Sequence, residues 1–212
     1  VTVPSWDGDK CLQCNNCAFS CPHACLRPFV LTPEEAAAAP EGAKLERVKS
    51  GKGKGVYKYT MTVSPLDCMG CGVCVGQCPT HALEMKPASS QAAQQKVFDY
   101  CVNDTAEKPE MFDLTVRFSQ YNPPLLEFSG ACAGCAETSY ARVATQLFGE
   151  RMIVSNATGC SSIWGGPAAV SPYTVNRQGR GPAWANSLFE DNAEHGLGIY
   201  LGQKKIRDDL RD

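Results

Sequence analysis

Eight of the thirteen cysteines in this 212-residue chain stand in two runs with identical spacing, and each run ends in proline. The first run is Cys11, Cys14, Cys17, Cys21 and Pro22, and the second is Cys68, Cys71, Cys74, Cys78 and Pro79. Thiolates are soft ligands that select zinc, copper(I) or iron–sulfur centres. The chemistry that this pattern indicates is therefore metal binding by cysteine.

Structural zinc and iron–sulfur clusters are the two kinds of centre that commonly use cysteine alone. Structural zinc sites draw four ligands from two pairs, whereas each run here offers a triplet and a more distant fourth cysteine. The C-x₂-C-x₂-C-x₃-C-P spacing is that of bacterial two-cluster ferredoxins. Two [4Fe–4S] clusters are thus favoured, and paired structural zinc is the alternative.

In that spacing the fourth cysteine of each run ligates the other cluster. The proline after it cannot continue the hydrogen-bonding pattern of the loop. We therefore expect two crossed ligand sets: Cys11, Cys14, Cys17 and Cys78 (cluster site 1), and Cys68, Cys71, Cys74 and Cys21 (cluster site 2). Such a pair of centres carries electrons.

Composition narrows the class of protein. A net charge of −2 argues against nucleic acid as the partner. No apolar stretch approaches the ~20 residues of a membrane span, so we expect no membrane partner. Clustered metal-binding thiols, rather than a disulfide framework, favour a reducing compartment, either the cytoplasm or the interior of an organelle.

The chain divides into three parts. We expect residues 1–87 to form an α+β, ferredoxin-like domain with two [4Fe–4S] clusters. Residues 88–124 are expected to be a linker with a short helix at 91–102. Residues 125–212 are expected to begin an α/β domain with a parallel sheet.

A long insertion separates the two cysteine runs. It contains a glycine- and lysine-rich loop at 50–55 and a predicted hairpin strand at 56–63. The loop lacks the residue order of a phosphate-binding P-loop. Two explanations stay open: the loop is a flexible solvated turn, or positive charge there steers an acidic electron acceptor towards the clusters. The lysines concerned are Lys49, Lys52, Lys54 and Lys58.

The third part predicts a strand at 125–128, a helix with apolar residues from Tyr140 to Leu147, and a strand at 152–154. Gly149 suits the position just past the helix end. Strand, helix and strand in this order form a parallel unit with its functional turns at the carboxyl ends of the strands.

Three further cysteines fall on those turns. Cys132 and Cys135 precede the helix, whose N-terminus stabilises negative charge, and Cys160 follows the second strand. A third iron–sulfur cluster is favoured, with a thioredoxin-like dithiol or zinc as alternatives. A cluster needs a fourth ligand, and neither Cys25 nor Cys101 is well placed; Cys101 is expected to be buried and inert.

Four stretches carry a specific resemblance: GACAGCAE at 130–137, LFGER at 147–151, NATGCSSIWGG at 156–166 and GPAWANSLFEDNAEHG at 181–196. They resemble the start of the thiamine-diphosphate domain of the pyruvate:ferredoxin (flavodoxin) oxidoreductase family. A two-cluster ferredoxin domain precedes that domain in the family, as it does here. The resemblance therefore covers nearly the whole chain.

The resemblance implies that Cys132, Cys135 and Cys160 ligate a third [4Fe–4S] cluster, whose fourth ligand lies outside the chain. It also implies that Glu137 and Cys160 contact thiamine diphosphate. The implied activity is the oxidative decarboxylation of a 2-oxo acid, most simply pyruvate, with coenzyme A. The implied assembly is a homodimer, and the implied acceptor is ferredoxin or flavodoxin.

Two departures from the family pattern indicate a fragment. The chain contains no Gly-Asp-Gly motif for the Mg²⁺ of thiamine diphosphate, and it stops in a predicted amphipathic helix at 204–212. We therefore expect a truncated thiamine-diphosphate domain that works with the remainder of the same polypeptide. The chain alone is expected to be inactive, and we assign it no catalytic residue. The alternatives are a stand-alone, polyferredoxin-like electron carrier, or a related 2-oxo acid or NADP-linked enzyme.

Overall fold

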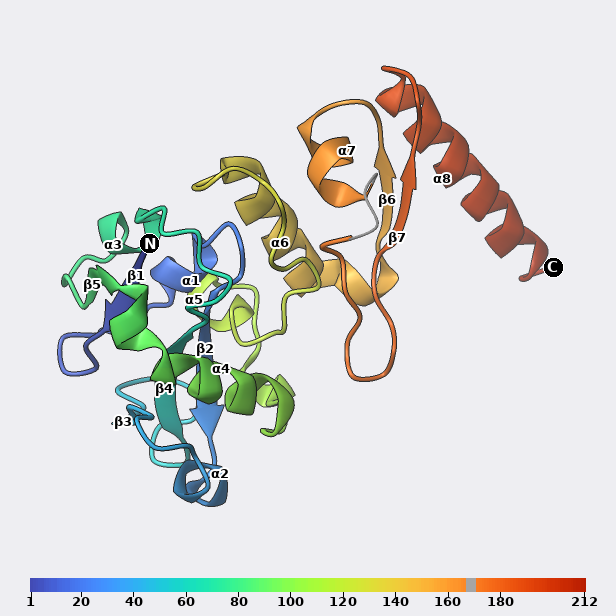
Figure 1. Cartoon of the computed structure of the whole chain (residues 1–212). Helices are drawn as coiled ribbons and strands as arrows, with labels where there is room; N and C mark the ends of the chain where they lie inside the picture. Colours follow the sequence, from blue (N-terminus) through green and yellow to red (C-terminus); the bar gives the residue numbers. More distant parts are fainter. Residues whose placement is uncertain (167–170) are drawn as a thin grey trace.

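A computed structural model describes residues 1–166 and 171–212 of the chain. Figure 1 shows a mixed α/β arrangement in which the first half of the chain forms one compact body. The last quarter lies beside that body and ends in a helix that points away from it.

Each cysteine run lies between two strands. These are β1 (Thr2–Trp6) and β2 (Leu26–Leu31) for the first run, and β4 (Lys58–Val63) and β5 (Leu83–Pro87) for the second. β1 pairs with β5, and β2 pairs with β4, both antiparallel. This exchange of strands holds the two runs together. The short helices inside them, α1 (Asn16–Phe19) and α3 (Val73–Gly76), contact each other.

The insertion folds onto the same sheet. It forms helix α2 (Pro33–Ala37) and the short strand β3 (Glu46–Arg47), which pairs antiparallel with β4. The predicted hairpin strand is thus confirmed, with its start at Lys58. Trp6 and Tyr59 meet edge to face in the core beneath the cysteine runs, with ring centroids 5.8 Å apart.

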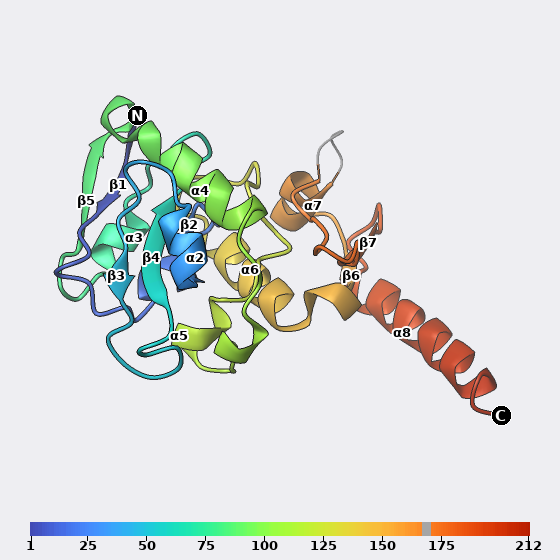
Figure 2. The ribbon, with the colours of Figure 1, turned by 90° about the horizontal axis from the view of Figure 1, so that it is seen from below.

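The segment at 88–124 is packed rather than extended. Its elements are the 3₁₀ turn η1 (Ala88–Gln91), helix α4 (Ala93–Asn103), the 3₁₀ turn η2 (Pro109–Met111) and helix α5 (Val116–Ser119). The predicted helix is confirmed as α4, which packs on β4 (Figure 2). Cys101 is buried, as expected, and burial raises the pKa of its thiol to about 12.

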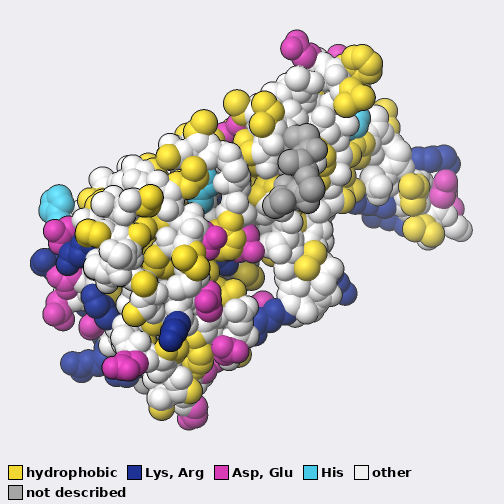
Figure 3. All heavy atoms as spheres, viewed as in Figure 1, with side chains coloured by type: hydrophobic (Ala, Val, Ile, Leu, Met, Phe, Trp, Pro, Cys, Tyr) yellow, Lys and Arg dark blue, Asp and Glu magenta, His cyan; other side chains and the backbone are white. Residues whose placement is uncertain are grey.

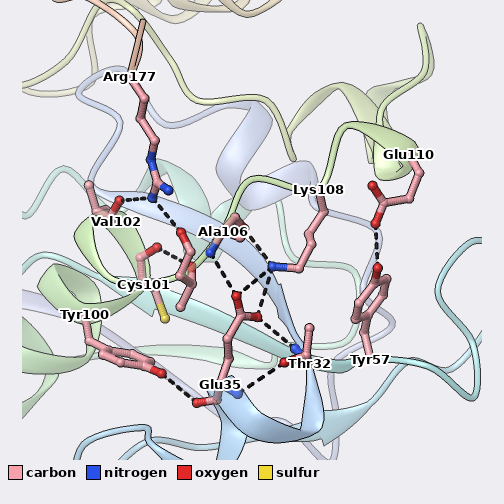
Figure 4. A network of polar contacts seen from close by, with 11 residues as sticks. Thr32, Glu35, Tyr57, Tyr100, Cys101, Val102, Ala106, Lys108, Glu110 and Arg177 are labelled. Carbon is pink, nitrogen blue, oxygen red and sulfur yellow. Dashed lines mark hydrogen bonds and ion pairs between the residues drawn. The ribbon is translucent and has the colours of Figure 1, made fainter.

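A polar network fixes this segment to the insertion (Figure 4). The Glu35 carboxylate accepts hydrogen bonds from the backbone N–H groups of Thr32 and Ala106, both at 2.8 Å. It also pairs with Lys108 Nζ at 2.9 Å. Arg177, from the third part of the chain, donates to the carbonyl oxygen of Val102 at 2.9 Å. All three parts of the chain are therefore held together by direct contacts.

The third part is built on a parallel strand pair. Its elements are helix α6 (Ala136–Phe148), the 3₁₀ turn η3 (Gly149–Arg151), strand β6 (Ile153–Asn156), helix α7 (Cys160–Gly165), strand β7 (Ala183–Asn186) and helix α8 (Asn192–Asp209). β6 and β7 pair in parallel, with α7 in the connection between them.

Two expectations for this part are wrong. Residues 125–128 form no strand, only an isolated bridge between Leu126 and Tyr173. Phe128 has a φ of 51°, which turns the chain out of extended geometry. The parallel partner of β6 is consequently β7 and not the segment at 125–128.

Gly149 directly follows the last residue of α6, as expected, but it does not adopt left-handed geometry. Its φ is −49°, and the chain continues into η3. Glycine is required there for space, because a Cβ would lie 2.8 Å from a methyl carbon of Leu125.

Helix α8 confirms the predicted C-terminal helix but begins earlier, at Asn192. None of its residues is buried, and hydrophobic and charged side chains lie next to one another along it (Figure 3). Among the described helices, none combines the length and the apolar character needed to cross a membrane.

Candidate iron–sulfur sites

Cysteines from both runs surround one small cavity. Cys68, Cys71 and Cys74 of the second run line it together with Cys21, the fourth cysteine of the first run. This grouping is the one expected of cluster site 2. The structure therefore places the fourth cysteine with the other run, and the assignment of these residues as ligands stays a prediction.

The remaining four cysteines gather in the same crossed way. Burial raises the pKa of the Cys11 thiol, and the neighbouring thiols of Cys14 and Cys78 raise it further. The pKa of the Cys17 thiol is likewise raised, first by burial and then by the charges of Cys11 and Cys74. Cys78 therefore lies with the first run, as expected of cluster site 1. Helix α1, which contains Cys17, contacts helix α3, which contains Cys74, so the two cluster sites are neighbours.

The chemistry of these donors fits an iron–sulfur core. Burial, and then the charge of neighbouring thiolates, raise the pKa of Cys11, Cys17, Cys68 and Cys74, the last to about 12. A positively charged metal core removes that penalty, because metal binding displaces the protons. Within residues 1–166 and 171–212, no three His, Cys, Asp or Glu side chains are grouped to hold a single metal ion.

Two buried side chains beside the cysteines present nitrogen atoms that no described residue satisfies. Trp6 Nε1 is unpartnered and lies close enough to Cys11 to lower the pKa of that thiol against the effect of burial. His23 Nε2 is also unpartnered, and His23 lines the cavity of cluster site 2. Its Nδ1 is held 3.2 Å from Ser129 Oγ. Donors to cluster sulfur are a known means of tuning such centres, so these atoms also fit the group.

The backbones of the two runs repeat an unusual geometry. Two positions in each run have positive φ: Gln13 and Asn15 in the first, and Gly70 and Gly72 in the second, with φ between 57° and 75°. Glycine adopts this geometry without strain, whereas glutamine does not. The second run thus has glycine at both positions, whereas the first run must offset the backbone strain of its glutamine and asparagine.

Side-chain hydrogen bonds provide that compensation. Gln13 is fully buried; its amide donates to the carbonyl oxygen of Arg47 at 2.8 Å and accepts from the N–H of Lys49 at 2.9 Å. Asn15 donates to the carbonyl oxygen of Arg117 at 2.7 Å and accepts from Tyr59 Oη at 2.9 Å. These two amides tie the loop of cluster site 1 to the insertion and to α5.

We expect Gln13→Ala to weaken cluster site 1 selectively. The variant keeps the backbone strain and leaves buried polar groups unpaired, at a cost of about 1–3 kcal/mol. Iron retained after mild chelation should fall for cluster site 1 and not for cluster site 2. Gln13→Gly is the matched control, because it removes the strain along with the bonds and should lose less iron. Equal losses in both variants would contradict a strained loop.

The third group of cysteines lies at two helix starts. Cys135 is the N-cap residue of α6, and Cys160 is the first residue of α7. Trp164 Nε1, in the last turn of α7, donates to Glu137 Oε2, in the first turn of α6, at 3.4 Å. Cys132 and Cys160 are exposed. The assignment of Cys132, Cys135 and Cys160 as cluster ligands stays a prediction.

The lysine loop is partly engaged in local bonds. Lys49 Nζ donates to the carbonyl oxygen of Cys11 at 2.7 Å, and Lys52 pairs with Asp113 at 3.3 Å. All four lysines are exposed, but these contacts hold Lys49 and Lys52 in place. Steering of an acceptor by this loop stays a prediction, and these contacts weaken it for Lys49 and Lys52.

Several residues at the sites have no signal in the spacing of the cysteines. Gln13 and Asn15 could have been found by aligning the two runs, since they stand opposite Gly70 and Gly72. Arg142 contacts the first run from α6, more than 120 positions later in the chain. Only the tertiary structure reveals that contact.

Comparison with known proteins agrees with this geometry. The 4Fe-4S dicluster domain family matches residues 10–82. Three relatives are similar along the whole chain: a pyruvate-flavodoxin oxidoreductase of Klebsiella pneumoniae (53% identity over 100% of the chain), a pyruvate:ferredoxin oxidoreductase of Moorella thermoacetica (50% over 99%) and a pyruvate dehydrogenase [NADP(+)] of Cryptosporidium parvum (50% over 100%).

The chain spans only a small share of these relatives: 18% of the first two and 11% of the third. The match is to one segment of a much longer polypeptide, and that segment includes the dicluster domain. The chain is thus similar along its whole length to one segment of pyruvate:ferredoxin and pyruvate-flavodoxin oxidoreductases, and it contains a 4Fe-4S dicluster domain.

Proposed function

We propose that this chain is the electron-transfer segment of a 2-oxo acid oxidoreductase, most simply one that oxidises pyruvate with coenzyme A. Its role is to receive electrons from thiamine diphosphate at the site of Cys132, Cys135 and Cys160. They then pass through two ferredoxin-type sites. The observation that carries the proposal is the contact between the third site and cluster site 2.

That contact is made by Gly134, between Cys132 and Cys135. Its backbone approaches the second cysteine run so closely that a Cβ would lie 3.7 Å from Cys71 Cβ and 3.6 Å from a methyl carbon of Val73. Its φ of 76° suits glycine. The loop of Cys132 and Cys135 therefore adjoins cluster site 2.

The chain's own residues bind and insulate the centres. When bound, each [4Fe–4S] cluster supplies one-electron storage. Cys21 and Cys74 are buried and Cys17 is partly buried, so these side chains are largely protected from water. Each cysteine run supplies three ligands to one site and its fourth, Cys21 or Cys78, to the other site. The polypeptide therefore links the two sites and fixes their separation.

Structure and relatives favour this role over a stand-alone carrier. A carrier would need only the dicluster domain, yet helix α6 is docked on the first cysteine run through buried hydrogen bonds. The three relatives differ in the acceptor that their names state, while their identity to the chain is almost equal. The segment therefore serves what they share, internal electron transfer, and the acceptor is set elsewhere.

We further propose that residues 125–212 begin a thiamine-diphosphate domain, with Glu137 and Cys160 at the cofactor. The parallel pair of β6 and β7 supports this, because ligands in open parallel sheets bind beyond the carboxyl ends of the strands. Cys160 follows the carboxyl end of β6. Mg²⁺, the fourth ligand of the third cluster and a second subunit would come from outside this segment.

The test is metal content in the intact polypeptide. We expect about four iron and four sulfide ions for each cluster site, all lost from cluster sites 1 and 2 when their eight cysteines are replaced by alanine. Reduction by a 2-oxo acid, followed by electron paramagnetic resonance, should populate these sites in the wild type. Stoichiometric zinc in place of iron would refute the proposal. Iron that a 2-oxo acid cannot reduce would favour the carrier.

A further inference from the structure

Arg142 is a fully buried cation next to cluster site 2. It lies on α6, about two turns after Cys135, and is only 2% exposed. Such burial is unusual for arginine, which is seldom fully buried unless paired. No carboxylate of the described residues forms an ion pair with it.

All five N–H donors of its guanidinium are used. Three hydrogen bonds go to backbone carbonyl oxygens at the end of α1: Ala18 at 2.8 Å, Phe19 at 2.6 Å and Cys21 at 3.0 Å. Two more, from Nη1, go to the side-chain oxygens of Gln120 at 3.1 Å and Gln146 at 2.7 Å. Every acceptor is neutral, so hydrogen bonding alone does not balance the charge.

The charge lies against the Cys21 loop of cluster site 2, because Arg142 Nε donates to the Cys21 carbonyl oxygen at 3.0 Å. Arginine stays protonated in proteins, so the buried guanidinium brings a full positive charge to that loop. The guanidinium thus faces a ligand-bearing loop through a medium of low dielectric, where charges interact strongly.

We propose that Arg142 is the positioning residue that sets the reduction potential of cluster site 2. It holds the Cys21 loop in place, and its charge favours the reduced, more negative state of the site. The inference rests on the proposed iron–sulfur function. The lysine that contacts cluster site 1, Lys49, is exposed instead, so solvent screens its charge.

The test is potentiometry on the intact, cluster-loaded polypeptide, monitored by electron paramagnetic resonance. Signals of cluster site 2 are assigned as those missing from a Cys21→Ala variant. In Arg142→Met we expect the equilibrium constant for one-electron reduction of cluster site 2 to fall about tenfold, a shift of about 59 mV to lower potential. Arg142→Lys keeps the charge and should retain most of the wild-type potential. Lys96→Gln, which removes a positive charge from an exposed residue outside both cluster sites, is the control and should shift the potential of neither site.

A second variant separates charge from packing. Gln120→Glu keeps the side-chain shape and places a carboxylate where the amide oxygen accepts from Arg142, so it neutralises the guanidinium without removing it. Gln120→Glu should lower the reduction potential of cluster site 2, as Arg142→Met does. If Arg142→Met does not fold, Gln120→Glu alone tests the inference. Wild-type potential in a fully iron-loaded Gln120→Glu variant would overturn the inference. Absence of iron from the wild type would instead refute the proposed function.

Discussion

Replacing Cys21 by alanine is expected to empty cluster site 2 and to spare cluster site 1. Cys21 stands four residues after Cys17 in sequence, but it lines the cavity of Cys68, Cys71 and Cys74. Alanine supplies no ligand atom. The iron of the two sites should therefore fall by about half, since each cluster holds four iron ions. Iron and sulfide assays on the purified, intact polypeptide measure the loss.

Double variants identify which site is lost. If Cys21 and Cys74 hold the same cluster, the variant that lacks both should lose no more iron than either single variant. The variant that lacks Cys21 and Cys11 should lose the iron of both sites. The reverse pattern would contradict the crossed assignment. Cys25→Ala is the matched control, because Cys25 is also buried beside Cys21 but lies outside both predicted ligand sets.

The strands and helices around the cysteine runs could be predicted where local pattern and tertiary packing agree. The strand at β4 follows from alternation, and the short helix expected at 91–102 is α4; both are confirmed. The strand expected at 125–128 is absent because its only partner is a single bridge with Tyr173. A short apolar run does not reveal whether a partner strand will be available.

In the candidate sites, too, the sequence predicts some residues and not others. Spacing predicts which cysteines gather, because the loop geometry is local and repeated. The supporting residues depend on contacts between distant segments. Gln13 is recognisable only as the strained counterpart of Gly70, and Arg142 only from its hydrogen bonds to the end of α1. His23 is an ordinary surface residue by sequence, yet it lines the cavity of cluster site 2.

Glu137 marks the proposed junction between the thiamine cofactor and the third cysteine group. It stands in the first turn of α6, two residues after Cys135, and accepts a hydrogen bond from Trp164 of α7. A carboxylate there stabilises the helix by about 0.3–1 kcal/mol in any case. Its charge also reaches its surroundings: burial, and then Glu137, raise the pKa of Tyr173 to about 12.

The two roles of Glu137 predict different results for Glu137→Gln. Glutamine keeps the size of the side chain and still accepts from Trp164, but it lacks the charge. If the carboxylate contacts thiamine diphosphate, the dissociation constant of the cofactor should rise at least about tenfold, as expected for a charged hydrogen bond worth roughly 1.5–3 kcal/mol. Iron content should not change. Calorimetric titration of the cofactor into the intact apo-protein, with iron assayed on the same sample, measures both.

Glu150→Gln is the matched control, because Glu150 is exposed at the other end of α6. Wild-type affinity in Glu137→Gln would leave Glu137 with a helix-stabilising role alone, and loss of iron would place it in support of the third cysteine group.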